Sequence, residues 1–458
     1  MKLITPPLVI DEQDSFANDV LDRKVYGQAL RNLVVNSDDA LVISLDGKWG
    51  EGKTTFVKMW QGLLNEDKIP NVYIDAFAND YVDDAFISVA SAITNYAENN
   101  IKEADPSALN DFKDKAKKVG TKLLPWTARV GIKAVTLGII KDSDIDVLTD
   151  IQGDLSSTAS NLVGNLIEDR LNSHAEDIEM IESFKVILSE LPSKLQAAGE
   201  DKPLVIIIDE LDRCRPTFAV ELVEKIKHLF SVENVVFLLV MNKEQLEESI
   251  KCIYGQNIDA HTYLQKFVNL EMQIPKYIDK MGYSPSDIKK YTKNLIQIHE
   301  LEDTHHILST SIENFAQHLN LSLRQLEKVT TNLAIYYSSN TFSPNSIIII
   351  TFVSIVKVTH PNLFKQFLNN KVFYSQIQEK LNFEDINLTS ESSHQDRNWS
   401  RSILWIKAIT FDDREFDVLR EENPTFSPNL NDLIWNERIT HRQELIPHYA
   451  KKMNMFNV

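Results

Sequence analysis

The chain has 458 residues, a length that predicts about two to four domains of roughly 150 residues each. With 43% apolar and 25% charged residues it has the composition of a soluble globular protein, and its formal net charge of −18 argues against nucleic-acid binding by the surface as a whole. Its two cysteines, Cys214 and Cys252, are too few for a disulfide framework or a zinc site and suit a reducing compartment.

The N-terminal sequence MKLITPPLVIDEQD is not typical of a signal peptide, because prolines interrupt its apolar stretch and acidic residues follow at once. The longest apolar run, SIIIITFVSIV at 346–356, is well short of the roughly 20 residues that a membrane-spanning helix needs. We therefore expect a cytoplasmic protein without an integral membrane span. The run at 346–356 is interpreted as a buried core element.

A glycine-rich segment, DGKWGEGKTTF, follows a short apolar strand expected at 40–45 and precedes a helix expected at 54–64. Its spacing matches the phosphate-binding loop G-x-x-x-x-G-K-[ST]. In such a loop, glycines let backbone N–H groups turn onto phosphate oxygens at the positive end of a helix. The alternative is a glycine-rich turn in an ordinary α/β domain, which the flanking strand and helix disfavour. The predicted phosphate-binding residues are Gly47, Lys48, Trp49, Gly50, Glu51, Gly52, Lys53, Thr54 and Thr55.

Two side chains of this loop have specific expected roles. Lys53 would reach the β- and γ-phosphates, and the hydroxyl of Thr54 would ligate Mg²⁺. The predicted ligands of the site are therefore a nucleoside triphosphate and a magnesium ion.

Further along the chain, residues 113–133 form a basic stripe on an otherwise acidic protein. The basic residues are Lys113, Lys115, Lys117, Lys118, Lys122, Arg129 and Lys133, against Asp114 alone. The stripe and the apolar stretch that follows could lie on an anionic membrane surface or on nucleic acid, or dock a partner protein. The alternative is a solvated helix face whose apolar side lies in the core.

An acidic pair follows five consecutive apolar residues at 204–208, a run that is typical of a central strand in a parallel sheet. Asp209 would stand at the carboxyl end of that strand, where ligands bind in open α/β sheets, and would hold Mg²⁺. Glu210 is the candidate that activates the attacking water. An Asp-Glu pair alone is often only a feature of a strand end, but it follows a phosphate loop in the same chain.

Arg213 and Arg215 lie just beyond the acidic pair. Both are candidates for contacting a phosphate bound to a neighbouring subunit. Pairing with nearby acidic side chains is the alternative for at least one of them.

A helix expected at 217–231 and an apolar strand expected at 235–240 complete a βαβ unit. Asn242 follows that strand, level with Asp209. Its amide could sense the γ-phosphate or orient the water, or it could instead cap the next helix.

The runs DELDRCRPTFAVELVEKIKHLFSVENVVFLLVMNKEQLEESIKCIYG and DGKWGEGKTTF resemble the KAP family of P-loop NTPases, a STAND/AAA+-like group. The resemblance covers about residues 10–280 and continues more weakly to about 340. It places the segment 16–34 near the adenine. Phe77 stands where a tryptophan is common in the family. Within the weaker part, the segment 321–335 resembles a lid helix whose Arg324 could reach the γ-phosphate, or could be a solvated arginine.

The resemblance implies ATP binding and slow hydrolysis coupled to assembly or signalling. Family members include membrane-linked signalling scaffolds in animals and bacterial proteins associated with exclusion of phage. Some carry transmembrane helices between the two motifs, but here the candidate at 123–140 is interrupted by Pro125, Arg129 and Lys133. Because each charged residue costs about 2.5–3.5 kcal/mol at a bilayer centre, we expect it not to span.

The predicted fold is an α/β P-loop NTPase core with a parallel sheet, a helical insertion between the two motifs, and a helical C-terminal region. The expected units are the first part of the core at 1–95, the insertion at 96–200, the second part of the core at 201–280, a lid-like subdomain at 281–345 and the C-terminal helices at 346–458.

Two functions compete. In the first, the chain is an ATP-hydrolysing switch that controls its own assembly or a partner effector, with bacterial antiphage defence as the setting. In the second, it is a nucleotide-stabilised scaffold, associated through its basic insertion with a membrane surface or nucleic acid. The acidic pair Asp209-Glu210 favours the first. A motor on nucleic acid is supported only by the basic stripe.

Overall fold

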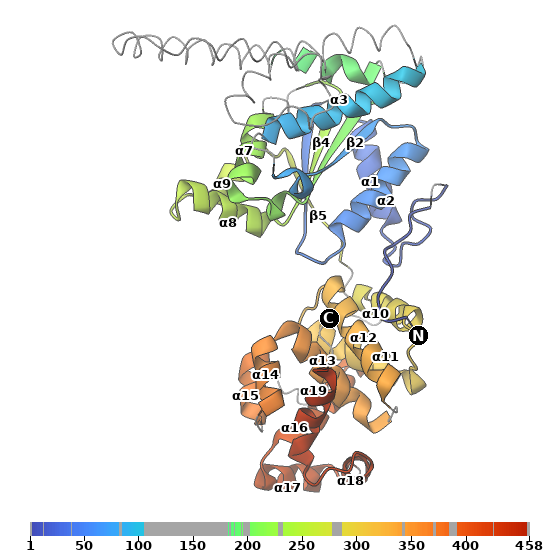
Figure 1. Cartoon of the computed structure of the whole chain (residues 1–458), viewed down its shortest axis with the longest axis vertical. Helices are drawn as coiled ribbons and strands as arrows, with labels where there is room; N and C mark the ends of the chain where they lie inside the picture. The colour runs from blue at the N-terminus through green and yellow to red at the C-terminus, as the bar shows by residue number, and fades with distance from the viewer. Residues whose placement is uncertain are drawn as a thin grey trace, which may run out of the picture.

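The computed structural model describes most of the chain outside the insertion. The described residues are 2–11, 13–37, 39–81, 85–104, 202–227, 232–276, 286–340, 344–369, 372–383, 392–424 and 426–455, with short helical pieces between 182 and 195. They form an α/β core and a helical region, which lies below the core in the view of Figure 1.

The core is built on a five-stranded sheet in the order β2-β3-β4-β1-β5, with all neighbouring strands parallel. Helices connect successive strands of the sheet, and after β5 the chain passes to the helical region. The elements are α1 (Lys24–Val35), β1 (Leu41–Asp46), α2 (Lys53–Glu66), β2 (Asn71–Asp75), α3 (Ala85–Ala104), β3 (Leu204–Asp209), α7 (Pro216–Ile226), β4 (Val235–Met241), α8 (Lys243–Tyr254), α9 (Ala260–Leu264) and β5 (Leu270–Gln273).

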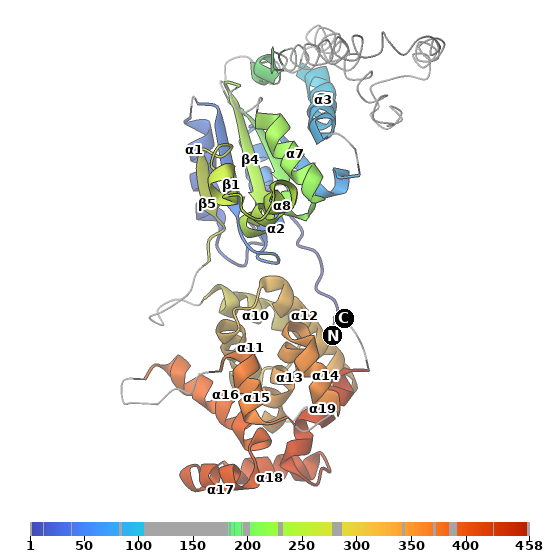
Figure 2. The ribbon, with the colours of Figure 1, turned by 90° about the vertical axis from the view of Figure 1, so that its left-hand side faces the viewer.

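Helices cover both faces of the sheet, as Figure 2 shows. One hydrophobic cluster joins one face to α1 and α2, and a second joins the other face to α3, α7 and α8. Every residue of β3 and β4 is buried, as expected for central strands of a parallel sheet. Each large apolar side chain buried there stabilises the fold by about 1.5–3 kcal/mol. The predicted α/β fold class, with an insertion between β2 and β3, is confirmed.

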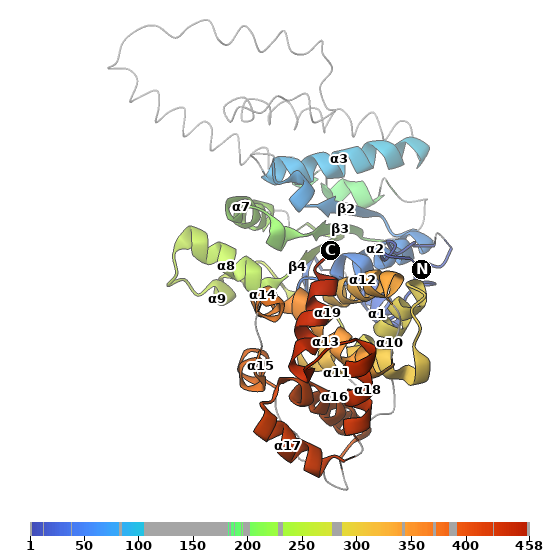
Figure 3. The same cartoon turned by 60° about the horizontal axis from the view of Figure 1, so that its bottom comes forward.

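The helical region has a hydrophobic core of its own. The apolar run predicted to be a buried core element forms α13, in which every residue from 347 to 356 is buried. Figure 3 shows α13 among the other helices of this region. One core contains residues from both ranges expected as separate units, 281–345 and 346–458. The helices are α10 (Asp287–Ile298), α11 (Ile307–His318), α12 (Leu323–Ser339), α13 (Ile347–Thr359), α14 (Pro361–Asn369), α15 (Tyr374–Leu381), α16 (His394–Thr410), α17 (Asp413–Glu422), α18 (Ser427–Asn436) and α19 (Leu445–Met453).

The N-terminal segment runs from the helical region to the core. His299 is fully buried, and its ring contacts the carbonyl oxygen of Lys2 (2.6 Å) and the hydroxyl of Thr5 (3.1 Å). Further along, Asp22 forms an ion pair with Lys290 of α10, with 2.6 Å between the charged atoms. The segment that precedes α1 is thus bound to the helical region at both of these points.

Helix α3 continues past residue 96, the expected start of the insertion, to Ala104. The basic stripe at 113–133 and the segment 123–140 lie outside the described residues. Among the helices that are described, none combines the length and the apolar character needed to cross a membrane.

Candidate functional site

The predicted phosphate loop, residues 47–52, joins β1 to α2 at the carboxyl edge of the sheet. Gly50 and Gly52 each have a φ of +82°, a conformation that side chains other than glycine rarely adopt. At Gly47, a Cβ atom would lie 2.7 Å from Cγ2 of Ile274. The three glycines of the motif are therefore required by the backbone geometry or by close packing.

Lys53 begins α2 and folds back over this loop. Its Nζ donates to the carbonyl of Gly47 and, at 3.3 Å, to that of Lys48. The side chain is buried, and burial lowers the pKa of Lys53, while the carboxylates of Asp212 and Asp209 oppose that shift. An ammonium group held among loop carbonyls is placed to exchange them for phosphate oxygens.

Glu51 holds the outer side of the loop. Its buried carboxylate accepts the backbone N–H of Lys48 at 2.9 Å and forms an ion pair with Lys276, just beyond β5. The guanidinium of Arg23 donates to the carbonyl of Glu51 (3.1 Å) and to that of Pro275 (3.4 Å). The loop is thus fixed to the chain before α1 and to the chain after β5.

Asp209 ends β3 and is almost completely buried, with 1% of its surface exposed. Its Oδ1 accepts the backbone N–H of Glu210 at 2.7 Å, and its Oδ2 accepts the hydroxyl of Tyr73 at 3.0 Å. A side-chain hydrogen bond also joins it to Thr54 of α2. Burial raises the pKa of Asp209, and these hydrogen bonds oppose the rise.

Glu210 follows in a left-handed conformation, with a φ of +60°. Non-glycine residues in this region cost about 1–3 kcal/mol and concentrate at functional sites. Its carboxylate forms an ion pair with Arg213, with 2.7 Å between Oε1 and NH1. Partial burial raises the pKa of Glu210, and the charge of Arg213 opposes that shift.

The two arginines beyond the acidic pair both contact acidic residues of this chain. Arg213 pairs with Glu210, whereas the backbone N–H of Arg215 donates to Asp80 at 3.0 Å. The Nε of Arg215 also lies 3.9 Å from that carboxylate. Pairing within the chain, the alternative raised by the sequence, is therefore seen for both.

Asn242 lies at the N-terminus of α8, directly after β4, and is 6% exposed. Its side chain makes no capping hydrogen bond to α8. Asp46, at the end of β1, takes that place, because its Oδ1 accepts the backbone N–H of Lys243 at 2.8 Å. The side chain of Asn242 is thus not engaged as the cap that the sequence offered as its alternative role.

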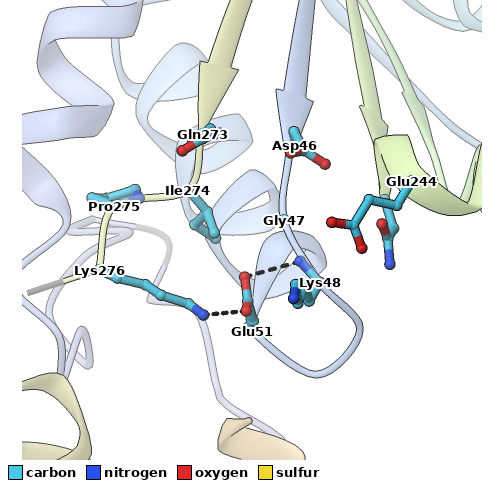
Figure 4. Close-up of a pocket in the computed structure, with 10 residues that line it drawn as sticks. Asp46, Gly47, Lys48, Glu51, Glu244, Gln273, Ile274, Pro275 and Lys276 are labelled. Atoms are coloured by element: carbon cyan, nitrogen blue, oxygen red, sulfur yellow. Dashed lines mark hydrogen bonds and ion pairs between the residues drawn. The ribbon is translucent and has the colours of Figure 1, made fainter. Parts of the chain in front are cut away.

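A pocket of about 430 Å³ opens between the loop, the start of α8 and the chain leaving β5 (Figure 4). Glu244 borders it on one side and Lys276 on the other, and Asn242 is also one of its lining residues. Lys48 and Glu51 of the loop lie between these two walls. Polar groups from three strand ends therefore converge beside the phosphate loop.

Arg324 lies in the first turn of α12, and the helical region meets the core at this point. Its backbone N–H donates to the carbonyl of Gly50 at 3.1 Å, and its side chain is exposed. Ser322 caps the same helix through a capping box with Gln325. The structure thus places Arg324 at the tip of the phosphate loop.

Trp49, at the tip of the loop, is 47% exposed. Its indole N–H donates to the buried carboxylate of Asp212 in the turn after β3. This contact joins the loop to the segment that carries the acidic pair.

The residues predicted to hold Mg²⁺ suit that ion chemically. Mg²⁺ takes oxygen ligands, and proteins commonly supply one or two of them beside phosphates and water. The hydroxyl of Thr54 and the carboxylate of Asp209 are such ligands, and they already contact each other. Within the described part of the chain, no group of three or more His, Cys, Asp or Glu side chains forms another candidate metal site.

The structure thus brings Lys53, Thr54 and Asp209 together, with Glu210 beside them. Thr55 is exposed on the first turn of α2. Sequence reasoning missed Tyr73, Asp46 and Arg23. A tyrosine two residues before the end of a strand was the available signal for the first, but only the strand order shows which carboxylate it meets.

A family model described as the KAP family P-loop domain matches residues 23–340. The chain belongs to the KAP family. The KAP match begins at Arg23, includes the phosphate loop, β3 and α12, and leaves α13 and the helices after it outside. A P-loop domain is a nucleotide-binding fold, and residues 47–54, the predicted phosphate-binding loop, lie within the matched range.

One protein sequence and one solved structure show distant similarity to this KAP chain. An uncharacterized protein of Methanocaldococcus jannaschii is 31% identical over 135 residues, which are 28% of this chain and 68% of that protein. A structure of the Aeropyrum pernix ORC2 protein in ADPNP and ADP complexes has 13% identity and a TM-score of 0.32, with 88% of this chain and 96% of that chain covered.

Proposed function

We propose that this KAP protein binds ATP with Mg²⁺, hydrolyses it slowly, and uses the bound nucleotide to control its own assembly or a partner effector. The observation that carries the proposal is the contact between Thr54 and the buried Asp209, with Glu210 next along the chain. These groups supply what phosphoryl transfer to water needs, namely a metal-binding pair and a base.

In the proposed reaction, Lys53 and the backbone N–H groups of the loop bind the phosphates. Glu210 accepts a proton from the water whose oxygen attacks the γ-phosphorus. The bond from that phosphorus to the bridging oxygen breaks, leaving ADP and inorganic phosphate. Thr54 and Asp209 would hold Mg²⁺, which when bound offsets the charge of the phosphate oxygens.

The ion pair with Arg213 engages Oε1 of Glu210, so the second oxygen, Oε2, is proposed to take that proton. Asn242 and Arg324 approach the loop from β4 and α12 and are proposed to contact the γ-phosphate. Contacts that exist only with ATP bound would give the helical region a different position in the ATP and ADP states.

The test uses Glu210→Gln, which keeps the size of the side chain but cannot take the proton. The variant should bind ATP with Mg²⁺ normally, hydrolyse it at least a hundredfold more slowly, and hold the ATP state. We expect light scattering after size exclusion to show a larger assembly, or a retained partner, that the unmodified protein forms only transiently.

Glu221→Gln is the matched control. It makes the same chemical change on α7, where the carboxylate pairs with Lys225 at 2.5 Å, away from the loop. It should hydrolyse ATP at the normal rate. If Glu210→Gln binds ATP yet has the same size and partners as the unmodified protein, the switch is rejected in favour of a nucleotide-stabilised scaffold.

The proposed setting is antiphage defence in the cytoplasm, which rests on the resemblance to bacterial KAP proteins. Cells expressing the chain should then reduce phage plating efficiency, and Lys53→Ala should abolish the effect. Equal plating efficiency with and without the unmodified chain, over a broad phage panel, would reject the role in antiphage defence. The proposed ATP hydrolysis would not be affected by that result.

A further inference from the structure

The side chain of Tyr73 on β2 contacts Asp209, the last residue of the neighbouring strand β3. Its hydroxyl donates to Oδ2 of Asp209, with 3.0 Å between the oxygens, although the two residues are 136 positions apart in sequence. In the register of the two strands, Tyr73 lies beside Ile207, and Asp75 lies beside Asp209. The tyrosine therefore approaches the carboxylate from the neighbouring strand, below the carboxyl edge of the sheet.

The ring of Tyr73 is held on its other side by α2. It is half-buried against the cluster that α2 forms with the sheet, and the Nζ of Lys58 lies 3.7 Å from the ring centroid. Lys58 follows Thr54 by one helical turn. The ring is thus packed between the helix that carries Thr54 and the strand that carries Asp209, which gives its hydroxyl a defined direction.

Both oxygens of Asp209 have donors from the protein. Oδ1 accepts the backbone N–H of Glu210, and Oδ2 accepts the hydroxyl of Tyr73. Only 1% of Asp209 is exposed, so water cannot replace a donor that is lost. Without Tyr73 the carboxylate would keep only the backbone N–H of Glu210 and the hydroxyl of Thr54 as donors, and a buried carboxylate with fewer fixed donors turns more freely about its last bond.

We propose that Tyr73 is a positioning residue of the metal–nucleotide site. It holds the carboxylate of Asp209 in the orientation that faces Thr54, so that the two oxygen ligands need no rearrangement when Mg²⁺ and ATP bind. This inference rests on the proposed function, because it gives Tyr73 a part in the same site.

The test is Tyr73→Phe, which removes the hydroxyl and keeps the ring and its packing. We expect the Mg²⁺ concentration that half-saturates binding of a non-hydrolysable ATP analogue to rise at least threefold. Binding of the analogue in EDTA should stay within twofold of the unmodified protein, because Lys53 and the loop are intact. A purely structural tyrosine would leave the Mg²⁺ requirement unchanged.

Tyr96→Phe is the matched control, because the hydroxyl of Tyr96 accepts the backbone N–H of Asn71 at the other end of β2. It removes a hydroxyl that contacts the same strand without touching Asp209, and its Mg²⁺ requirement should be normal. If Tyr96→Phe raised the requirement as much as Tyr73→Phe, the effect would belong to the strand and the proposal would fail.

A double-mutant cycle links the effect to Asp209. In an Asp209→Asn background, Tyr73→Phe should change the Mg²⁺ requirement by less than twofold, because the charged partner is gone. A full additional loss there, or an unchanged or lower requirement for the single variant, would overturn the inference. If the unmodified protein bound ATP analogues equally with and without Mg²⁺, the proposed function itself would fail instead.

Discussion

The backbone N–H of Arg324 donates a hydrogen bond to the carbonyl of Gly50, so that the first turn of α12 rests on the tip of the phosphate loop. The close approach depends on the missing side chain of Gly50. A Cβ atom there would lie 2.8 Å from both Cβ of Arg324 and Oγ of Ser322. A nucleotide that changes the conformation of the loop at Gly50 would therefore also change this contact with α12 of the helical region.

Gly50→Ala should disturb this contact. The new methyl group meets α12, and the left-handed backbone adds a cost of about 1–2 kcal/mol. We expect a lower melting temperature, faster proteolysis between the core and the helical region, and ATP binding weakened at least fivefold.

Gly255→Ala controls for backbone strain. Gly255 also has a positive φ, +96°, but a Cβ there would meet no atom within 4 Å. This variant should lose stability while binding ATP normally. Normal ATP binding and normal proteolysis in Gly50→Ala would show that the contact with α12 has no influence on the site.

Lys53→Ala should lower ATP affinity at least tenfold, because hydrogen bonds to charged groups contribute about 1.5–3 kcal/mol each. Isothermal titration measures the loss. Lys251→Ala is the control, since that partly exposed lysine pairs with Glu248 on α8. Unchanged ATP binding by Lys53→Ala would remove the assignment of the loop as the phosphate site.

Asn242→Ala should slow ATP hydrolysis and leave ADP binding and the melting temperature unchanged, because Asn242 does not cap α8 through its side chain. Asp46→Ala is the informative partner variant. It removes the acceptor for Lys243 and should cost about 0.5–2 kcal/mol of stability, as lost caps do. Equal losses of ATP and ADP binding by Asn242→Ala would argue against γ-phosphate sensing.

Glu437 makes the stability of the helical region depend on pH. Burial alone would raise its pKa, but hydrogen bonds from Lys452 (3.0 Å) and His448 (2.9 Å) outweigh burial and hold the pKa below its ordinary value of 4.5. Because the folded pKa is lowered, this stabilisation is complete above pH 4.5 and is lost as the pH falls below it.

Glu437→Gln should therefore lower the melting temperature near pH 7, and by less near pH 4. Glu421→Gln, an exposed position on α17, should leave the melting temperature nearly unchanged at both values. A difference between Glu437→Gln and the unmodified protein that stays constant from pH 4 to pH 8 would contradict the assignment.

The strands and the phosphate loop could be predicted from the sequence, because each depends on a local pattern of apolar residues or glycines. The run at 204–208 is entirely apolar, and β3 is buried at every position. The glycines at 50 and 52 coincide with positive φ angles. A hydrogen bond joins Thr54 to Asp209, and their shared role as metal ligands stays a prediction.

Contacts across the sheet were not accessible in the same way. Tyr73 meets Asp209 only because β2 lies next to β3, and Asp46 caps α8 only because β1 lies next to β4. Strand order is a property of tertiary packing, and no local spacing encodes it. The helical region was expected as two units but has a single hydrophobic core, because the packing of helices distant in sequence is likewise not encoded in local spacing.

The strand order also has a consequence for the growing chain on the ribosome. β1 and β2 do not pair with each other, and β2 must wait for β3, which is synthesised more than a hundred residues later. At about 5–20 residues per second, that interval lasts several seconds or longer. The entropic cost of closing a long loop is small, about 0.6 kcal/mol for each doubling of its length. The insertion therefore has a small effect on the stability of the sheet, and its main effect is to delay the pairing of β2 with β3. Until β3 and β4 emerge, the phosphate loop stands on a strand without neighbours, and nascent chains of this length are the ones that need protection from aggregation.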